Sequence, residues 1–310
     1  MNQYTTLFER QSYQDALDFF MESLTNEKQT VWDYVILTAS NDDQAKAYEM
    51  QIEHRLQNHQ IPSRTHYAVI PDLNGQRVGS GGATFSAIRY VKEYEDAGKA
   101  EDVKKAEDVK KAEDAKKAED AKKAEDAGKA EDAEKTEQTE NVENAKNAEV
   151  NMQSAQVYSG SLDGLRRNPF EGKRILVIHS GGDSKRVPQY SACGKLFSPV
   201  PRILPGGRRS TLFDEFLIGM STVASRISEG MLVCSGDVLL LFNALQIDFY
   251  GAGAAALSIK EKVETGKNHG VYLKDADGNV GRFLHKQTVE TLGSCGAVDG
   301  RGMVDIDTGA

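Results

Sequence analysis

Two glycines and two cations in the middle of the chain have the types and spacing of a phosphate-binding site. Gly181 and Gly182 follow an apolar run, and because they lack Cβ atoms their backbone N–H groups can approach phosphate oxygens closely. Arg186 follows within one turn and carries a permanently charged guanidinium group, and Lys195 comes nine residues later. Two cations beside a glycine turn suit a polyphosphate whose α-phosphorus gathers negative charge as it is attacked.

Two familiar nucleotide-binding loops are not present at this position. Residues 180–188 match neither a Walker A motif nor the G-x-G-x-x-G pattern. The sequence therefore does not support a P-loop ATPase or a dinucleotide-binding fold.

The glycine turn ends the strand of one of several strand–turn–helix units. Asn41 supplies N-cap chemistry for the helix of the first unit, and the second unit turns through Asn74-Gly75 before a further glycine-rich stretch. Apolar runs and helical spacing predict strands at 33–40, 65–71, 174–179, 230–235, 254–260 and 303–310, helices at 44–57, 85–96 and 211–225, and a hairpin joining 271–273 to 280–284. Strands alternating with helices predict an α/β fold with a doubly wound, mainly parallel sheet.

One charged segment interrupts this pattern. Residues 97–150 contain 12 Lys and 17 Asp or Glu and no aromatic residue, and a Lys-Ala-Glu-Asp unit recurs in them every six residues. On a helix this period places the alanines on three separate stripes, so no single apolar face forms. We predict a low-complexity insert, helical or disordered, between the first part of a domain (1–96) and its second part (151–310), and favour a spacer over a partner-binding arm.

Composition limits the class of protein. The net charge is −9, which argues against general attraction to nucleic acid or to an anionic membrane. Cys193, Cys234 and Cys295 are odd in number and far apart, which favours core residues in a reduced cytoplasm over disulfides or a zinc site. No secretory signal and no apolar run of membrane-spanning length is present in the sequence.

Six segments, taken together, resemble the GDP-fucose pyrophosphorylase domain of the L-fucokinase/fucose-1-phosphate guanylyltransferase family. They are LTASNDDQA (37–45), VGSGGAT (78–84), HSGGDSKRVPQYSACGKLFSPVP (179–201), SGD (235–237), HGVY (269–272) and DTG (307–309). The 179–201 segment is also a variant of the wider sugar nucleotidyltransferase signature, a Gly-Gly turn followed by Arg, Pro and Lys. The resemblance covers both sides of the charged insert and implies a sugar nucleotidyltransferase type of fold.

The resemblance implies transfer of GMP from GTP to L-fucose 1-phosphate, with release of pyrophosphate. By this analogy Gly181, Gly182 and Ser184 cradle the triphosphate, and Arg186 stabilises charge on the reacting phosphates. Lys195 bridges the nucleotide and sugar phosphates. A magnesium ion, Mg2+, is implied as cofactor, held by Asp237 at the end of an apolar strand.

Further residues are assigned to the nucleotide and the sugar. Thr38 and Ala39, at the end of the first strand, border the base, and Gly79, Ser80, Gly81 and Gly82 suit ribose, base or phosphate. For the sugar we expect His269, Gly270, Lys286 and Asp307. Lys286 departs from the family pattern because His285 and Gln287 replace the acid and proline beside it. We expect His269 to be a turn or pocket-wall residue rather than a catalyst. His179 is expected to be a hydrogen-bonded residue at a strand end.

Several alternatives stay open on the sequence alone. A nucleotidyltransferase for another sugar 1-phosphate, or a non-catalytic nucleotide-binding fragment, fits the same phosphate chemistry. The family often joins this domain to C-terminal domains, including a fucokinase, for which residues 1–310 show no glycine-rich kinase loop followed by the other kinase motifs. Because the chain stops just after a strand, we expect a partial domain, with GTP and a sugar 1-phosphate as its ligands.

Overall fold

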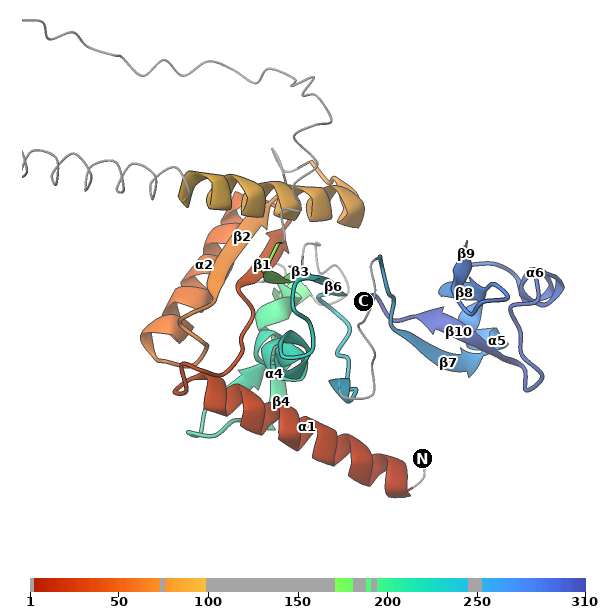
Figure 1. Ribbon diagram of the computed structural model, residues 1–310, viewed down its shortest axis with the longest axis horizontal. Helices are drawn as coiled ribbons and strands as arrows, with labels where there is room; N and C mark the ends of the chain where they lie inside the picture. The colour runs from red at the N-terminus through yellow and green to blue at the C-terminus, as the bar shows by residue number, and fades with distance from the viewer. Residues whose placement is uncertain (1–2, 73–75, 99–170, 181–187, 191–193, 245–252) are drawn as a thin grey trace, which may run out of the picture. The chain divides into compact units, whose positions relative to one another are not determined.

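Four strands between residues 34 and 235 form a parallel sheet. The computed structural model describes residues 3–72, 76–98, 171–180, 188–190, 194–244 and 253–310 (Figure 1). The sheet has the order β2-β1-β3-β6, and every neighbouring pair is parallel. Its strands are β1 (Tyr34–Ala39), β2 (His66–Pro71), β3 (Arg174–His179) and β6 (Gly230–Ser235). This sheet confirms the predicted α/β class.

The two central strands explain why the sequence reads as continuous apolar runs. All six residues of β1 are buried, and so are the four central residues of β3. A parallel strand that is covered on both faces needs apolar side chains at successive positions rather than at alternate ones. The edge strands β2 and β6 are mostly half-buried.

The helices begin at well-formed caps. In α2 (Asp42–Gln57) the side chain of Asn41 accepts a hydrogen bond of 2.9 Å from the backbone N–H of Gln44, as the sequence predicts. In α4 (Leu212–Ala224) Thr211 and Asp214 form a reciprocal capping box. The sequence analysis missed α1 (Gln3–Ser23), which packs on α4, where Ser221 Oγ donates to the carbonyl of Ala16 at 3.1 Å.

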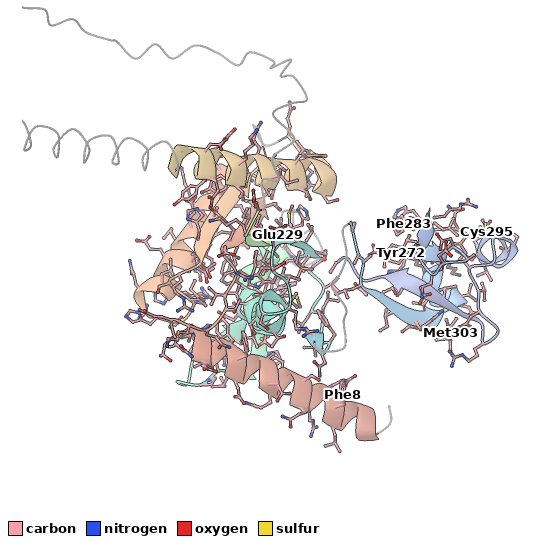
Figure 2. All side chains as sticks on the ribbon, in the orientation of Figure 1. Phe8, Glu229, Tyr272, Phe283, Cys295 and Met303 are labelled. Atoms are coloured by element: carbon pink, nitrogen blue, oxygen red, sulfur yellow. The ribbon has the colours of Figure 1, made fainter. Side chains whose placement is uncertain are left out.

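A second sheet near the C-terminus is antiparallel, with the order β7-β10-β8-β9. Its strands are β7 (Ser258–Lys262), β8 (Gly270–Lys274), β9 (Val280–His285) and β10 (Met303–Asp307), accompanied by the short helices α5 (Val263–Gly266) and α6 (Val289–Ser294). Tyr272 and Phe283 face each other across β8 and β9, with ring centroids 5.2 Å apart (Figure 2). The predicted hairpin is confirmed, but a mainly parallel arrangement does not extend to this part of the chain.

Short elements connect the parallel sheet to α4. The 3-10 turns are η3 (Pro188–Tyr190) and η4 (Lys195–Phe197), and β4 (Pro199–Ile203) pairs antiparallel with β5 (Arg209–Thr211). Cys234 lies in the core, where burial raises the pKa of its thiol to about 12. Cys295 is half-buried and Cys193 lies outside the described residues.

Two predicted boundaries are wrong. The helix expected from Phe85 begins at residue 79 and is described to residue 98, so the glycines at 79, 81 and 82 lie in its first turn rather than in a preceding loop. The strand expected at 254–260 starts later, at Ser258. Both starts lie in or next to stretches rich in glycine and alanine, whose small side chains give no hydrophobic periodicity from which the start of a helix or strand could be predicted.

The charged insert falls almost entirely outside the described residues, and its role as a spacer stays a prediction. The chain divides into two compact units, one made of Met1–Arg89 with Pro169–Ala310 and the other of Tyr90–Asn168. All residues of the candidate site belong to the first unit. Among the helices that the structure describes, none has the length and hydrophobicity needed to cross a bilayer.

Candidate functional site

A cavity of about 310 Å³ lies at the carboxyl ends of the parallel strands. All four strand ends contribute to its wall: Thr38 and Ala39 from β1, Asp72 after β2, His179 and Ser180 from β3, and Ser235, Gly236 and Asp237 from β6. Arg77, Gly79, Ser80, Ala83 and Lys195 complete the lining. Ligands of open α/β sheets bind at this edge, so the cavity is the candidate site.

Lys195 and Asp237 form an ion pair in the cavity wall. The ammonium nitrogen of Lys195 lies 3.6 Å from Oδ2 of Asp237, and both side chains are partly exposed. Ser235 Oγ donates to Oδ1 of the same carboxylate at 2.8 Å. The structure thus brings the predicted catalytic lysine and the predicted metal ligand together, from segments that are 42 residues apart in the sequence.

The backbone before Lys195 has a conformation that requires glycine. Gly194 has a φ of +68°, and a Cβ at this residue would overlap the hydroxyl of Tyr48. Tyr48 is fully buried on α2, and its hydroxyl also donates to the carbonyl of Ser180 at 3.2 Å. One tyrosine therefore fixes both the turn that carries Lys195 and the end of β3.

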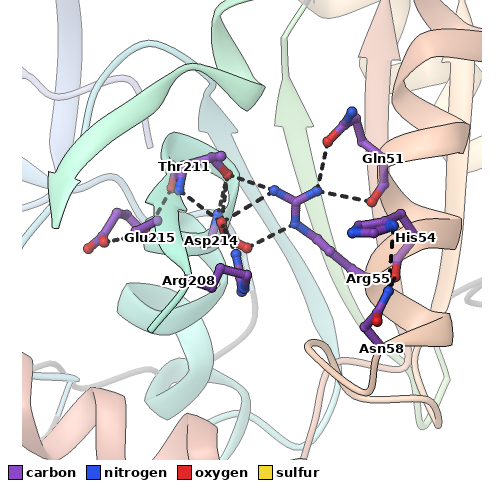
Figure 3. A network of polar contacts seen from close by, with 9 residues as sticks. Gln51, His54, Arg55, Asn58, Arg208, Thr211, Asp214 and Glu215 are labelled. Atoms are coloured by element: carbon purple, nitrogen blue, oxygen red, sulfur yellow. Dashed lines mark hydrogen bonds and ion pairs between the residues drawn. The ribbon is translucent and has the colours of Figure 1, made fainter. Parts of the chain in front are cut away.

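A buried polar network joins α2 to α4 (Figure 3). Arg55 of α2 donates to Asp214 of α4 through Nε at 3.0 Å, and Arg208 contacts the other carboxylate oxygen at 2.7 Å. Burial alone would raise the pKa of Asp214, but hydrogen bonds from Arg208 and Arg55 outweigh it and hold that pKa below its usual value. The guanidinium of Arg55 also lies 5.0 Å from the ring centroid of Phe197, the last residue of η4.

His179 joins three elements at the cavity. Its Nε2 lies 2.9 Å from the hydroxyl of Thr84 and its Nδ1 lies 3.5 Å from the hydroxyl of Thr38. The hydroxyl of Thr84 lies 3.0 Å from the carbonyl of Ser80, to which it donates, so we assign a neutral ring that donates from Nε2. Burial lowers the pKa of His179, in keeping with this neutral form. The expected hydrogen-bonded strand-end residue is confirmed.

We expect acid to weaken the fold through His179. Its folded-state pKa is lowered from 6.5, so the unfolded state takes up the proton first as the pH falls. The contribution of the neutral ring is complete above about pH 6.5 and is lost between that value and the folded-state pKa, at about 1.4 kcal/mol per unit of pKa difference. Urea unfolding of the wild type and of His179→Gln at pH 7.5 and 5.5 measures it. An equal gap between the two proteins at both pH values would contradict this expectation.

The glycines of the 78–84 segment have different surroundings. Gly79 and Ser80 line the cavity, whereas Gly81 and Gly82 are not part of its wall. A Cβ on Gly82 would come within 2.8 Å of Cβ of Val78, so this glycine has a packing role. The helix start thus presents its first two residues to the site.

The residues predicted to bind the sugar lie in the strands of the antiparallel sheet or directly beside them, and they do not line the cavity. His269 is exposed and its carbonyl accepts from the backbone of Lys286 at 2.9 Å, while a Cβ on Gly270 would overlap the ring of Phe283. Asp307 accepts hydrogen bonds of 2.9 Å from the hydroxyl of Tyr272 and from the backbone of Gly309.

The DTG segment nevertheless touches the cavity wall. The carbonyl of Gly309 accepts a hydrogen bond of 2.8 Å from the backbone of Ser235, a lining residue of β6. Asp307 is therefore linked to the cavity wall through Gly309, which hydrogen-bonds both to Asp307 and to Ser235. A direct role of Asp307 in sugar binding stays a prediction.

Four predicted residues lie outside the described part of the chain: Gly181, Gly182, Ser184 and Arg186. Their roles stay predictions. The sequence analysis in turn missed Asp72, Arg77 and Ser180 as lining residues. The available signal was their position, since Asp72 directly follows β2 and Ser180 directly follows β3.

A comparison of the sequence with models of known protein families finds a match in the part of the chain that carries Lys195 and Asp237. Residues 168–310 match the model of the fucose pyrophosphorylase domain. The resemblance seen in the sequence is confirmed. The matched fucose pyrophosphorylase region includes Lys195 and Asp237 and the whole antiparallel sheet, while β1 and β2 lie before it.

Curated relatives match over most of the chain, including the part before residue 168. A bifunctional fucokinase/GDP-fucose pyrophosphorylase of Arabidopsis thaliana is 27% identical over 90% of this chain and 23% of its own length. A fucose-1-phosphate guanylyltransferase of Mus musculus is 23% identical over 86% of this chain and 35% of its own length, and that of Homo sapiens is 23% identical over 86% and 34%. The chain thus spans about a quarter to a third of these relatives. No solved structure matches it significantly.

Proposed function

We propose that this chain is a nucleotidyltransferase that forms GDP-L-fucose and pyrophosphate from GTP and L-fucose 1-phosphate. The observation that carries the proposal is the Lys195–Asp237 pair, 3.6 Å apart in a cavity at the carboxyl edge of a parallel sheet. The names of the relatives supply the identity of the base and of the sugar. The predicted glycine turn at 181–182 directly follows Ser180, which lines the same cavity.

The reaction needs alignment and neutralisation of charge more than proton transfer. A phosphate oxygen of fucose 1-phosphate forms a bond to the α-phosphorus of GTP, and the bond from that phosphorus to the bridging oxygen breaks as pyrophosphate leaves. The attacking phosphate is already an anion, so no general base is required. Lys195 lowers the barrier by holding positive charge where negative charge accumulates, and Arg186 is proposed to do the same.

The residues at the end of β6 fit a magnesium ion. Mg²⁺ binds proteins through one or two carboxylates and takes its other ligands from substrate phosphates and water. Asp237 supplies one carboxylate, oriented by the hydroxyl of Ser235. Bound there, Mg²⁺ would neutralise phosphate oxygens of the nucleotide.

Cellular location and ligands complete the proposal. The odd number and wide spacing of the cysteines favour the cytoplasm. The net negative charge favours a nucleotide and a sugar 1-phosphate as ligands rather than nucleic acid.

Calorimetric titration with GTP, ATP and UTP in the presence of Mg²⁺, followed by a pyrophosphate assay with fucose 1-phosphate, tests the proposal. We expect GTP to bind at least about 10-fold more tightly than the other two, because base recognition depends on matched hydrogen bonds. Pyrophosphate release is expected with fucose 1-phosphate and not with galactose 1-phosphate. A preference for another nucleotide or sugar would assign a different nucleotidyltransferase, and GTP binding without release would assign a binding protein.

A further inference from the structure

A carboxylate that the proposed reaction does not use lies at the β2 end of the cavity. Asp72 directly follows β2 and lines the cavity wall, and its backbone N–H donates to the carbonyl of Ala39 at 2.7 Å. This bond continues the pairing of β2 with β1, so the position of Asp72 is set by the sheet. Burial raises the pKa of Asp72, and the positive charge of nearby Arg77 partly offsets the effect.

The wall next to Asp72 is apolar and small. Ala39 and Ala83 both line the cavity and are 1% and 8% exposed, respectively. Methyl groups of this size leave room for a planar ring and exclude water from its faces. Small side chains at these two positions leave space in the cavity for a nucleotide base.

The order of the strands places Asp72 at one side of the cavity and the Lys195–Asp237 pair at the other. Asp72 follows β2 and Asp237 follows β6, the two outer strands of the sheet. Three strand spacings of about 4.8 Å place these strand ends about 14 Å apart. A nucleotide with its phosphates near Lys195 therefore extends toward Asp72 with its nucleoside.

Guanine is the base that matches a carboxylate with a guanidinium beside it. Its Watson–Crick edge offers two adjacent donors, N1–H and the 2-amino group, and an acceptor, O6. A carboxylate accepts two such bonds side by side, and an arginine donates to the remaining oxygen. Adenine offers one donor and an acceptor in reversed order at this edge, and uracil has one donor between two acceptors.

We infer that Asp72, assisted by Arg77, recognises the N1–H and 2-amino groups of guanine and determines the base specificity of this site. The inference rests on the proposed function, in which the nucleotide is GTP. It assigns to Asp72 binding of the base, while Lys195 and Asp237 act at the phosphates.

Inosine triphosphate and 2′-deoxyguanosine triphosphate separate base recognition from ribose recognition. ITP lacks only the 2-amino group and dGTP lacks only the 2′-hydroxyl. In the wild-type chain we expect calorimetry with Mg²⁺ to show about 10-fold weaker binding of ITP than of GTP, the size of one hydrogen bond to a charged group. Equal affinity of GTP and ITP would overturn the inference without the use of any variant.

Two substitutions at residue 72 then locate the effect. In Asp72→Asn an amide N–H faces a donor of guanine, and we expect GTP affinity to fall about 10- to 100-fold. In Asp72→Ala the ratio of GTP to ITP affinity should fall to about 1. Asp277→Asn, in the exposed hairpin turn between β8 and β9, is the matched control and should bind GTP as the wild type does.

The outcomes distinguish this inference from the proposed function. If the wild type binds no guanine nucleotide, the proposed function fails and the inference fails with it. If GTP binds and Asp72→Ala keeps the wild-type preference over ITP, only the inference fails. If Asp72→Ala instead abolishes discrimination against dGTP alone, Asp72 binds the ribose and the assignment to guanine is wrong. Thermal unfolding of each variant confirms that it is folded at the titration temperature.

Discussion

Replacing Lys195 with alanine is expected to lower the rate of pyrophosphate release about 10²- to 10³-fold, the usual cost of losing one positioned charge or donor at a reacting centre. Lys195 is one of two cationic side chains, with Arg77, among the described residues that line the cavity. Its partner Asp237 fixes the ammonium group at the end of β6. Single-turnover measurements with GTP and fucose 1-phosphate give the rate of the chemical step.

The stability of Lys195→Ala should change little. The side chains of Lys195 and Asp237 are 34% and 52% exposed, and an ion pair with this much solvent contributes at most about 1 kcal/mol. Lys28→Ala, at an exposed position outside the cavity lining, serves as control and should release pyrophosphate at the wild-type rate. Turnover of Lys195→Ala within twofold of the wild type would remove this residue from the mechanism.

Replacing Arg55 with alanine is expected to have the largest effect on stability, a loss of about 3–5 kcal/mol in the free energy of unfolding. Arg55 and Asp214 are 4% and 1% exposed, and their atoms are 3.0 Å apart. Removing the guanidinium leaves the buried carboxylate of Asp214 with Arg208 as its remaining cationic partner. It also removes the cation that lies against the ring of Phe197. Urea unfolding of the wild type and the variant measures the difference.

Two comparisons show whether the loss comes from the ion pair. Lys46→Ala, an exposed position on the same helix, should change stability by less than about 0.5 kcal/mol. The cost of Arg55→Ala combined with Asp214→Asn should be smaller than the sum of the single costs, because the second change removes the uncompensated charge. Additive costs would contradict a coupled pair.

Acid should also act on this network. The pKa of Asp214 is lower in the folded state than in the unfolded state, so its contribution is present at neutral pH and is lost as the pH falls through the folded-state value. The difference between the wild type and Asp214→Asn should therefore shrink only at strongly acidic pH.

Local patterns in the sequence were sufficient for much of the parallel sheet. The strands at 174–179 and 230–235 were predicted at the residues where the structure has them, because β3 and β6 are apolar runs bounded by turn residues. The cap at Asn41 was predicted for a similarly local reason, since an N-cap side chain binds a backbone group three residues ahead. The helix α1 was missed, although its buried residues Tyr13, Ala16 and Phe20 have the three- to four-residue spacing of an amphipathic helix.

The candidate site was only partly visible in the sequence. Lys195 and Asp237 were identified by motif, and Thr38 and Ala39 by their place at a strand end, and all four line the cavity. Asp72 was missed because a single aspartate after a short strand resembles many turn residues. Its place in the cavity wall depends on the pairing of β2 with β1, which brings its backbone N–H to the carbonyl of Ala39. The charge of Arg77 acts on its carboxylate.

The sequence by itself determined the types of residue available for phosphate chemistry, the strand–turn–helix units and the family resemblance. The tertiary structure decided which of those residues share a cavity, because β1 pairs with β3 across about 140 residues and so joins Thr38 to His179. His269 and Lys286 do not line that cavity, because they lie directly beside strands β8 and β9 of the antiparallel sheet. Chain pairing over such distances depends on packing of the whole core, which no short pattern of residues encodes.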